Sequence, residues 1–232
     1  MKLKYMAAAV ATAALAFLPN QTSAAPLFVA GPSPVAPFGG TLINFEGQAE
    51  GTVITNQYGG VVFSQPDGGA PIIDNLPQLF GYGPGSGTGM LTGSTNGGAA
   101  FPTIAPIVAT LSAPATQVGA FFSDTAPLGN YTISAFGAGH VLLESFVVTS
   151  AQLTAAGCDT IFPAVTGCGV FVGFSRAGGD IVSIQFGPSS SANDSFAIDD
   201  FRYISAVPEP VSMSLLGLGL AGVAARRARK RA

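Results

Sequence analysis

Short apolar runs alternate with turn-forming residues over most of this 232-residue chain. Several runs place apolar side chains at every second position, as in Tyr131–Phe136 and Ile181–Phe186. A period of two is typical of strands that bury one face, and runs this short between Gly, Pro, Asn and Ser are typical of strands joined by turns. The pattern predicts an all-β fold, an antiparallel β-sandwich of roughly seven to ten strands, with a brief helix at Ser150–Ala156.

One domain over residues 41–206 is expected to contain these strands. A Pro-rich stretch at 25–40 is expected to be an extended lead-in. Two glycine-rich segments within Gln65–Pro102 are expected to be surface loops. The strands are expected at Thr41–Glu46, Thr52–Thr55, Gly60–Ser64, Ile104–Ser112, Gln117–Ser123, Tyr131–Phe136, His140–Thr149, Gly169–Ser175, Ile181–Phe186 and Ser195–Ile204.

The first 24 residues have the composition of a secretory signal peptide. Lys2 and Lys4 make a basic start, Met6–Leu18 is apolar, and Thr22–Ala24 offers small residues before a cleavage point at Ala25. The chain is therefore predicted to be exported and cut by signal peptidase.

The last 26 residues, 207–232, contain three parts with different physical properties. Val207, Pro208, Glu209 and Pro210 form a rigid acidic motif, since proline fixes φ and lacks an N–H donor. The uncharged run Val211–Ala225 would reach about 22 Å as a helix, against about 30 Å of hydrocarbon, so it is short for a transmembrane helix. A C-terminal core helix is the alternative. The basic end favours the membrane segment; its cations are Arg226, Arg227, Arg229, Lys230 and Arg231.

This tail resembles the PEP-CTERM sorting signal of exopolysaccharide-producing Gram-negative bacteria. The resemblance implies that exosortase, an integral-membrane cysteine protease, processes the motif at 207–210. It also implies an inner-membrane-anchored precursor and a final place at the cell surface or in the extracellular matrix.

The region between the two signals is strongly acidic. Residues 25–206 hold two cations, Arg176 and Arg202, against eleven Asp and Glu, although the whole chain has a net charge of −3. A region with so few Lys and Arg side chains cannot neutralise the phosphates of a nucleic acid, which argues against nucleic-acid binding. Anionic lipid headgroups should repel it as well.

Cys158 and Cys168 are the two cysteines of the chain. In an oxidising compartment a pair this close in sequence predicts one disulfide around a local loop. A metal site or a catalytic thiol would need further partners, and His140 is the single histidine.

Catalytic motifs are missing from the sequence. His140 would have to be the base of a hydrolytic triad, yet no G-x-S-x-G nucleophile motif accompanies it. A carboxylate pair for glycoside hydrolysis could be assembled from the eleven acids, but the sequence singles out no pair. We therefore expect a protein that is not an enzyme.

Asp199 and Asp200 are the best candidates for a site. Neighbours in a strand point to opposite faces, so one of these carboxylates should face the core. Ion pairing with Arg202, or backbone N–H donors, could neutralise it.

Four segments also resemble the jelly-roll domains common in PEP-CTERM proteins, which look like carbohydrate-binding or concanavalin-like sandwiches. These segments are Phe45–Glu46, Gly60–Phe63, Gly169–Phe174 and Phe196–Phe201. The resemblance implies a structural Ca²⁺ held by Glu46 with Asp199 and Asp200, and hard carboxylate oxygens suit that ion.

The expected function is structural or adhesive, in exopolysaccharide or biofilm. The alternative is a calcium-assisted carbohydrate-binding module, in which Tyr58, Tyr82 and Tyr131 would stack on sugar rings. A glycan-active hydrolase comes third. The chain has no Trp, the usual platform for sugars.

Overall fold

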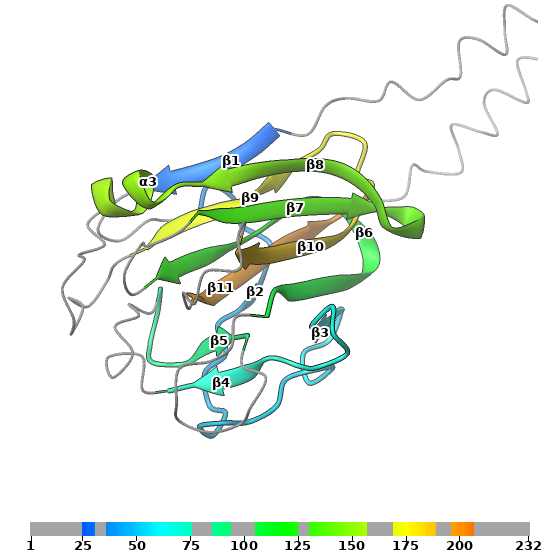
Figure 1. The fold of residues 1–232 in the computed structure, drawn as a ribbon. Helices are drawn as coiled ribbons and strands as arrows, with labels where there is room; N and C mark the ends of the chain where they lie inside the picture. Colours follow the sequence, from blue (N-terminus) through cyan, green and yellow to red (C-terminus); the bar gives the residue numbers. More distant parts are fainter. Residues whose placement is uncertain are drawn as a thin grey trace, which may run out of the picture.

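The computed structural model describes residues 25–30, 36–75, 85–93, 105–124, 130–156, 169–188 and 196–206. Within these ranges the chain is mostly β, every strand pair is antiparallel, and helices are few, which confirms the predicted fold class (Figure 1). The elements are β1 Ala25–Ala30, β2 Thr41–Ile43, β3 Val61–Ser64, β4 Ile72–Asp74, β5 Met90–Thr92, β6 Ile107–Asp124, β7 Tyr131–Gly137, η1 Ala138–His140, β8 Val141–Val148, α3 Ser150–Ala155, β9 Val170–Ser175, β10 Ile181–Pro188 and β11 Phe196–Ser205.

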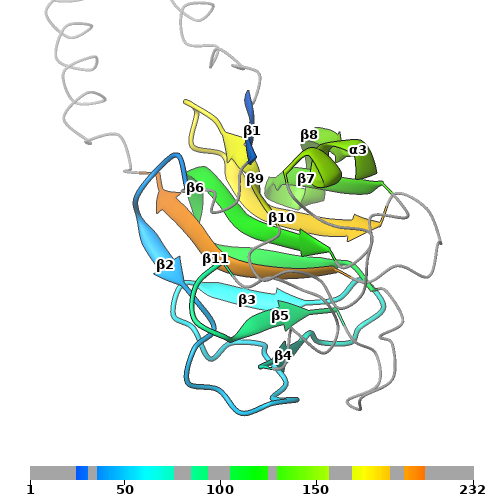
Figure 2. The same cartoon turned by 90° about the vertical axis from the view of Figure 1, so that its left-hand side faces the viewer.

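Strand β6 belongs to both layers of the sandwich. Its first half, from Ile107, pairs with β3 and β10, and β10 continues through β7 to β8. Its second half, from Gln117, pairs with β9 and β11, and these continue to β1 on one side and to β2, β5 and β4 on the other. The two layers are therefore one hydrogen-bonded sheet that folds over on itself (Figure 2).

The change of layer occurs around Pro114. The sequence predicts two strands here, Ile104–Ser112 and Gln117–Ser123, and the structure joins them into the 18-residue β6. The register of both β10 and β11 shifts at Ala115, which marks the bend. Proline lacks a donor and is compatible with such an irregularity. Its carbonyl oxygen accepts from the Ala206 N–H at 2.8 Å, so the bend also holds the end of β11.

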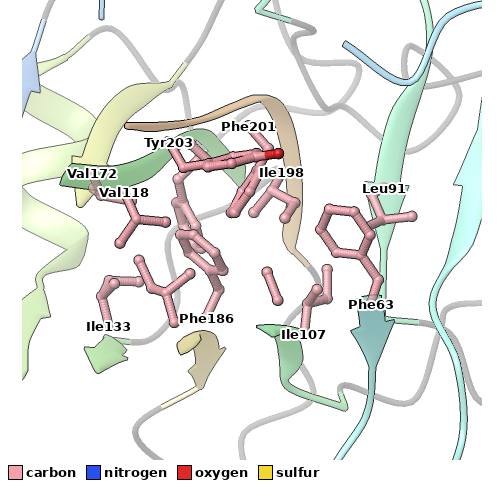
Figure 3. Close-up of a cluster of buried hydrophobic side chains, with 14 of the residues drawn as sticks. Phe63, Leu91, Ile107, Val118, Ile133, Val172, Phe186, Ile198, Phe201 and Tyr203 are labelled. Atoms are coloured by element: carbon pink, nitrogen blue, oxygen red, sulfur yellow. The ribbon is translucent and has the colours of Figure 1, made fainter. Parts of the chain in front are cut away.

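Aromatic rings fill the space between the layers. Phe63 of β3 meets Phe201 of β11 with ring centroids 5.4 Å apart, and Phe146 of β8 meets Phe174 of β9 at the same separation. Such edge-to-face pairs add about 0.5–1.5 kcal/mol each beyond their burial. Figure 3 shows how Val118, Ile198 and Phe186 converge between these elements.

Three strands form where the sequence analysis expected irregular chain. The Pro-rich lead-in contains β1, and the predicted loop region Gln65–Pro102 contains β4 and β5. β4 and β5 have three residues each, too few for periodicity to be visible, and β1 contains Pro26, which is unusual inside a strand. Conversely, the predicted strand Thr52–Thr55 is a single bridge from Val53 to Ile72.

The predicted helix at Ser150–Ala156 is confirmed as α3, and a capping box begins it. The Thr149 hydroxyl accepts from the Gln152 N–H, and the Gln152 side chain accepts from the Thr149 N–H at 2.9 Å. In the described part of the chain no helix is long and apolar enough to cross a membrane. The predicted membrane segment Val211–Ala225 and the signal peptide lie outside the described residues.

Two glycines allow β6 and β9 to approach each other. Gly119 and Gly173 are directly opposed, and a Cβ on Gly173 would collide with the Val118 carbonyl oxygen. We expect Gly173→Ala to lower the free energy of unfolding by about 1–3 kcal/mol, the usual range for overpacking. Urea unfolding measures this. Gly59→Ala is the matched control, because a Cβ there meets nothing within 4 Å, and an equal loss in both variants would contradict the close-packing argument.

Candidate functional site

The glycine-rich loop 85–89 lies against three carboxylates, Glu46, Asp199 and Asp200, which we call the acidic anchor. Glu46 follows β2, and its Oε1 accepts from the Thr88 N–H at 2.8 Å and the Gly89 N–H at 2.7 Å. One oxygen of Glu46 thus accepts hydrogen bonds from two successive backbone N–H groups of the loop.

Asp199 and Asp200 hold the other end of the same loop. The Ser86 N–H donates to Asp199 Oδ2 at 2.9 Å, and the Ser86 hydroxyl donates to Asp200 Oδ1 at 2.8 Å. Asp199 is buried, as expected for one of the two neighbours, but the carboxylates do not point to opposite faces, because both accept a hydrogen bond from Ser86. Between Asp199 and Arg202 the register of β11 against β6 shifts, and Asp200 has a φ of 46°, so a β-bulge turns both carboxylates toward Ser86.

Asp199 is fully buried, with 0% of its surface exposed. Burial raises its pKa to about 7, and the nearby Asp200 charge adds to the rise, while N–H donors from Ser86, Asp200 and Gly85 work against it. The three N–H donors therefore stabilise the charged carboxylate less than burial destabilises it. The Asp199 carboxyl keeps its proton up to a pH well above the one at which an exposed aspartate loses it.

Glycine is required where the loop meets the acidic anchor. Gly87 has a φ of +55°, and a Cβ there would collide with the Glu46 carboxylate. A Cβ on Gly89 would lie 2.7 Å from the Phe45 carbonyl oxygen. The absence of side chains in this part of the loop thus serves close contact with the carboxylates.

The three carboxylates that the jelly-roll resemblance assigned to Ca²⁺ each accept a hydrogen bond from the loop. Among the described residues, no three His, Cys, Asp or Glu side chains converge as metal ligands do. Glu46 Oε1 and both carboxyl oxygens of Asp199 accept bonds from backbone N–H groups. Glu46 fits the alternative already considered, in which backbone donors satisfy the carboxylate, whereas the raised pKa of Asp199 shows that its donors only partly offset burial.

Residues 25–206 contain two cations, Arg176 and Arg202, and neither forms an ion pair with the acidic anchor. Arg202 Nε is buried and has no hydrogen-bond partner among the described residues. Arg176 instead pairs with Asp180, where Nη2 donates to Oδ2 at 2.8 Å and the bond lowers the pKa of that carboxyl. The expected ion pair of Arg202 with Asp199 or Asp200 does not form.

The predicted glycan-binding tyrosines have different surroundings. Tyr131 is 1% exposed and packs on Phe122 with ring centroids 4.8 Å apart, so its ring has no face for a sugar. Tyr58 packs edge-on against Phe45 and Phe63, and burial raises the pKa of its hydroxyl. Tyr131 therefore belongs to the core, and Tyr58 is partly buried and packs against it. Tyr82 lies outside the described residues.

Other predicted residues lie partly outside the described ranges. Cys158 and Cys168, the motif Val207–Pro210 and the basic end are among the residues that are not described. His140 is described: it ends η1 with a φ of 60°, and its ring stacks on Phe136 at 4.2 Å. The His140 ring is thus engaged in a stacking contact beside β8.

The comparisons with known proteins confirm the sorting signal. The PEP-CTERM protein-sorting motif matches residues 206–230. The motif indicates an exported, surface-directed protein that is sorted by exosortase and anchored in the membrane as a precursor. A search of curated proteins found no match.

A search of solved structures found matches, one of which is to an adhesin domain. It is the crystal structure of the K2 cleaved adhesin domain of Lys-gingipain, with a TM-score of 0.47 and 14% identity, over 70% of this chain and 98% of that chain. A similarity of this extent carries no conclusion about what this chain binds.

The buried Asp199 should make stability depend on pH. As pH rises from about 4 to about 7, the unfolded chain releases the proton while the folded chain keeps it, so the free energy of unfolding should fall. The full effect is on the order of 4 kcal/mol. We expect Asp199→Asn to remove this slope in urea titrations between pH 4 and 8. The exposed control Asp67→Asn should keep the wild-type slope, and a slope that survives in Asp199→Asn would contradict the assignment.

Removing the Glu46 carboxylate should release the loop while leaving the sandwich folded. Charge-assisted hydrogen bonds contribute about 1.5–3 kcal/mol, so Glu46→Ala should speed amide hydrogen exchange at Thr88 and Gly89 by roughly ten- to a hundredfold. Exchange at core amides such as Val172 should be unchanged. Equal protection of Thr88 in wild type and variant would show that Glu46 does not hold the loop.

Proposed function

We propose that this chain is a non-enzymatic β-sandwich protein of the cell surface or extracellular matrix, with a structural or adhesive role in exopolysaccharide or biofilm. The observation that carries the proposal is the sorting motif at 206–230, attached directly to the last strand of the sandwich. A sorting signal joined to a folded domain suits a protein that is exported and then presented at the cell surface.

The proposed route has two processing steps. Signal peptidase removes residues 1–24 during export, and Val211–Ala225 then holds the precursor in the inner membrane. Exosortase acts at Val207–Pro210 and passes the sandwich to the surface or the matrix. The inner-membrane stage and the place of the cut are part of the proposal.

The carboxylates support a structural role over a catalytic one. A glycoside hydrolase keeps one carboxylate free for the substrate and one proton ready for the leaving group. Here Glu46 and Asp199 are engaged by loop amides, and Asp200 accepts from Ser86. The charges thus stabilise a loop at the surface of the sandwich.

The test of the route is made in an exopolysaccharide-producing Gram-negative host with exosortase. We expect Glu209→Ala to leave the protein in the membrane fraction as an uncut precursor and to reduce the matrix-bound form severalfold. The reason is that the change removes the acidic residue of the sorting motif. Glu50→Ala, a change of the same kind in the sandwich, should be processed normally. A Glu209→Ala protein that reaches the matrix at the wild-type level would contradict the route.

Matrix-derived protein then distinguishes the functional alternatives. Retention on the host polysaccharide, with no release of reducing ends, would support the structural or adhesive role. Retention that requires Ca²⁺, together with a rise in Tm on adding Ca²⁺ after EDTA, would favour the calcium-assisted carbohydrate-binding module. Release of reducing ends would favour the hydrolase and contradict the proposal.

A further inference from the structure

The two ends of the described sandwich lie at one end of the molecule. Ala25 pairs with Ser175, Ser175 with Gln117, and Gln117 with Ile204, two residues before Ala206. These pairs form one row across four strands, so three steps of about 4.8 Å place the start of β1 about 14 Å from the end of β11. Figure 1 shows β1 beginning and β11 ending at this end, opposite α3.

We call this end the terminal pole; it comprises Ala25, the β6 bend 112–116, the turn Arg176–Asp180, η1 and Ala206. The Arg176 N–H donates to the Thr116 carbonyl at 2.7 Å, which joins the turn to the bend. A Cβ on Gly137, just before η1, would meet the Asp180 carbonyl oxygen. The pole is therefore one connected surface.

The distance from the pole to the predicted membrane segment is short. Ala206 is fixed to Pro114 by a hydrogen bond, and the apolar run begins five residues later at Val211. Five residues span at most about 18 Å, and each headgroup layer takes about 5–8 Å of this. The pole must then lie within about 13 Å of the lipid surface whenever Val211 is at the hydrocarbon boundary.

The charges of the sandwich agree with this orientation. At the pole, the charges of Arg176 and Asp180 cancel in an ion pair. Asp200 of the acidic anchor lies six residues up β11 from Ala206, about 20 Å away. That is more than two Debye lengths at physiological salt, so repulsion from anionic headgroups is largely screened there.

Exposed apolar side chains lie beside the pole. Val141 and Leu142 begin β8 directly after η1 and are 60% and 55% exposed. Apolar side chains next to a nearly neutral surface suit contact with a headgroup layer better than contact with bulk water.

We infer that the terminal pole faces the phospholipid bilayer in the membrane-anchored precursor, with the acidic anchor and α3 directed away from it. The inference rests on the proposed function, because it requires the C-terminal anchor. The lipid surface is the partner, and it lies against the pole until the tail is cut.

The test uses the full chain reconstituted in phosphatidylethanolamine–phosphatidylglycerol vesicles that carry a headgroup-attached nitroxide quencher. A fluorescent amino acid replaces Ala177 at the pole or Ala151 in α3, both exposed. Ala151 lies beyond the other end of β8, about 23 Å from Val141. We expect several-fold stronger quenching at position 177 than at position 151.

A linker variant gives the matched control. Ten Gly and Ser residues inserted between Ala206 and Val207 add an r.m.s. length of about 17 Å and leave both the sandwich and the motif unchanged. Quenching at position 177 should then fall toward the value at position 151. Equal quenching at positions 177 and 151 in the chain without the linker would overturn the orientation.

Flotation of the same samples separates the two proposals. A chain that floats with the vesicles but shows equal quenching overturns the orientation alone. A chain that does not float overturns the anchored precursor of the proposed function, and the orientation with it.

Discussion

Strand β6 is the constraint on which the rest of the structure depends. It pairs with β3 and β10 along its first half and with β9 and β11 along its second, so strands from every part of the described chain are registered against it. Because the bend near Pro114 fixes how the two halves are oriented, it also fixes how the layers close over Phe63, Phe201 and Phe174. At the bend, the Pro114 carbonyl oxygen accepts a hydrogen bond from the Ala206 N–H. This bond connects β6 to the residue at which the sorting motif begins.

Residues 25–206 are acidic, and this composition determines which groups can donate hydrogen bonds to their carboxylates. With two cations available between residues 25 and 206, carboxylates must find other donors or remain in water. Backbone N–H groups are the remaining donors, and a glycine-rich loop presents them with the least obstruction. Glu46 and Asp199 use that source, whereas Arg202 is near in sequence but is not their partner.

Strands β7 and β10 could be predicted from the sequence because apolar residues that alternate over six positions match the period of a strand and not that of a helix. The short strands β4 and β5 could not, since three residues carry no period and their pairing depends on tertiary contacts. β1 was hidden by prolines, which an edge strand tolerates because its outer N–H groups need no partner.

The sequence analysis named the three residues of the acidic anchor but expected a different geometry for them. Asp199, Asp200 and Glu46 do gather around one segment, as the sequence analysis proposed. The partner is a loop, because a single residue with positive φ, Asp200, reverses the expected direction of one side chain. A bulge of this kind has no sequence signature unless glycine occupies it, so the pattern alone could not place both carboxylates against Ser86.

The shared position of the two ends follows from the order of strands. β1, β9, the second half of β6 and β11 are four neighbours, each antiparallel to the next, so three reversals separate the first from the last. An odd number of reversals makes β1 run away from the edge toward which β11 runs. The predicted export signal therefore precedes, and the sorting motif follows, strand ends that lie at the same end of the sandwich. One strand more or fewer in this row would place the signals at opposite ends of the molecule, separated by the length of a strand.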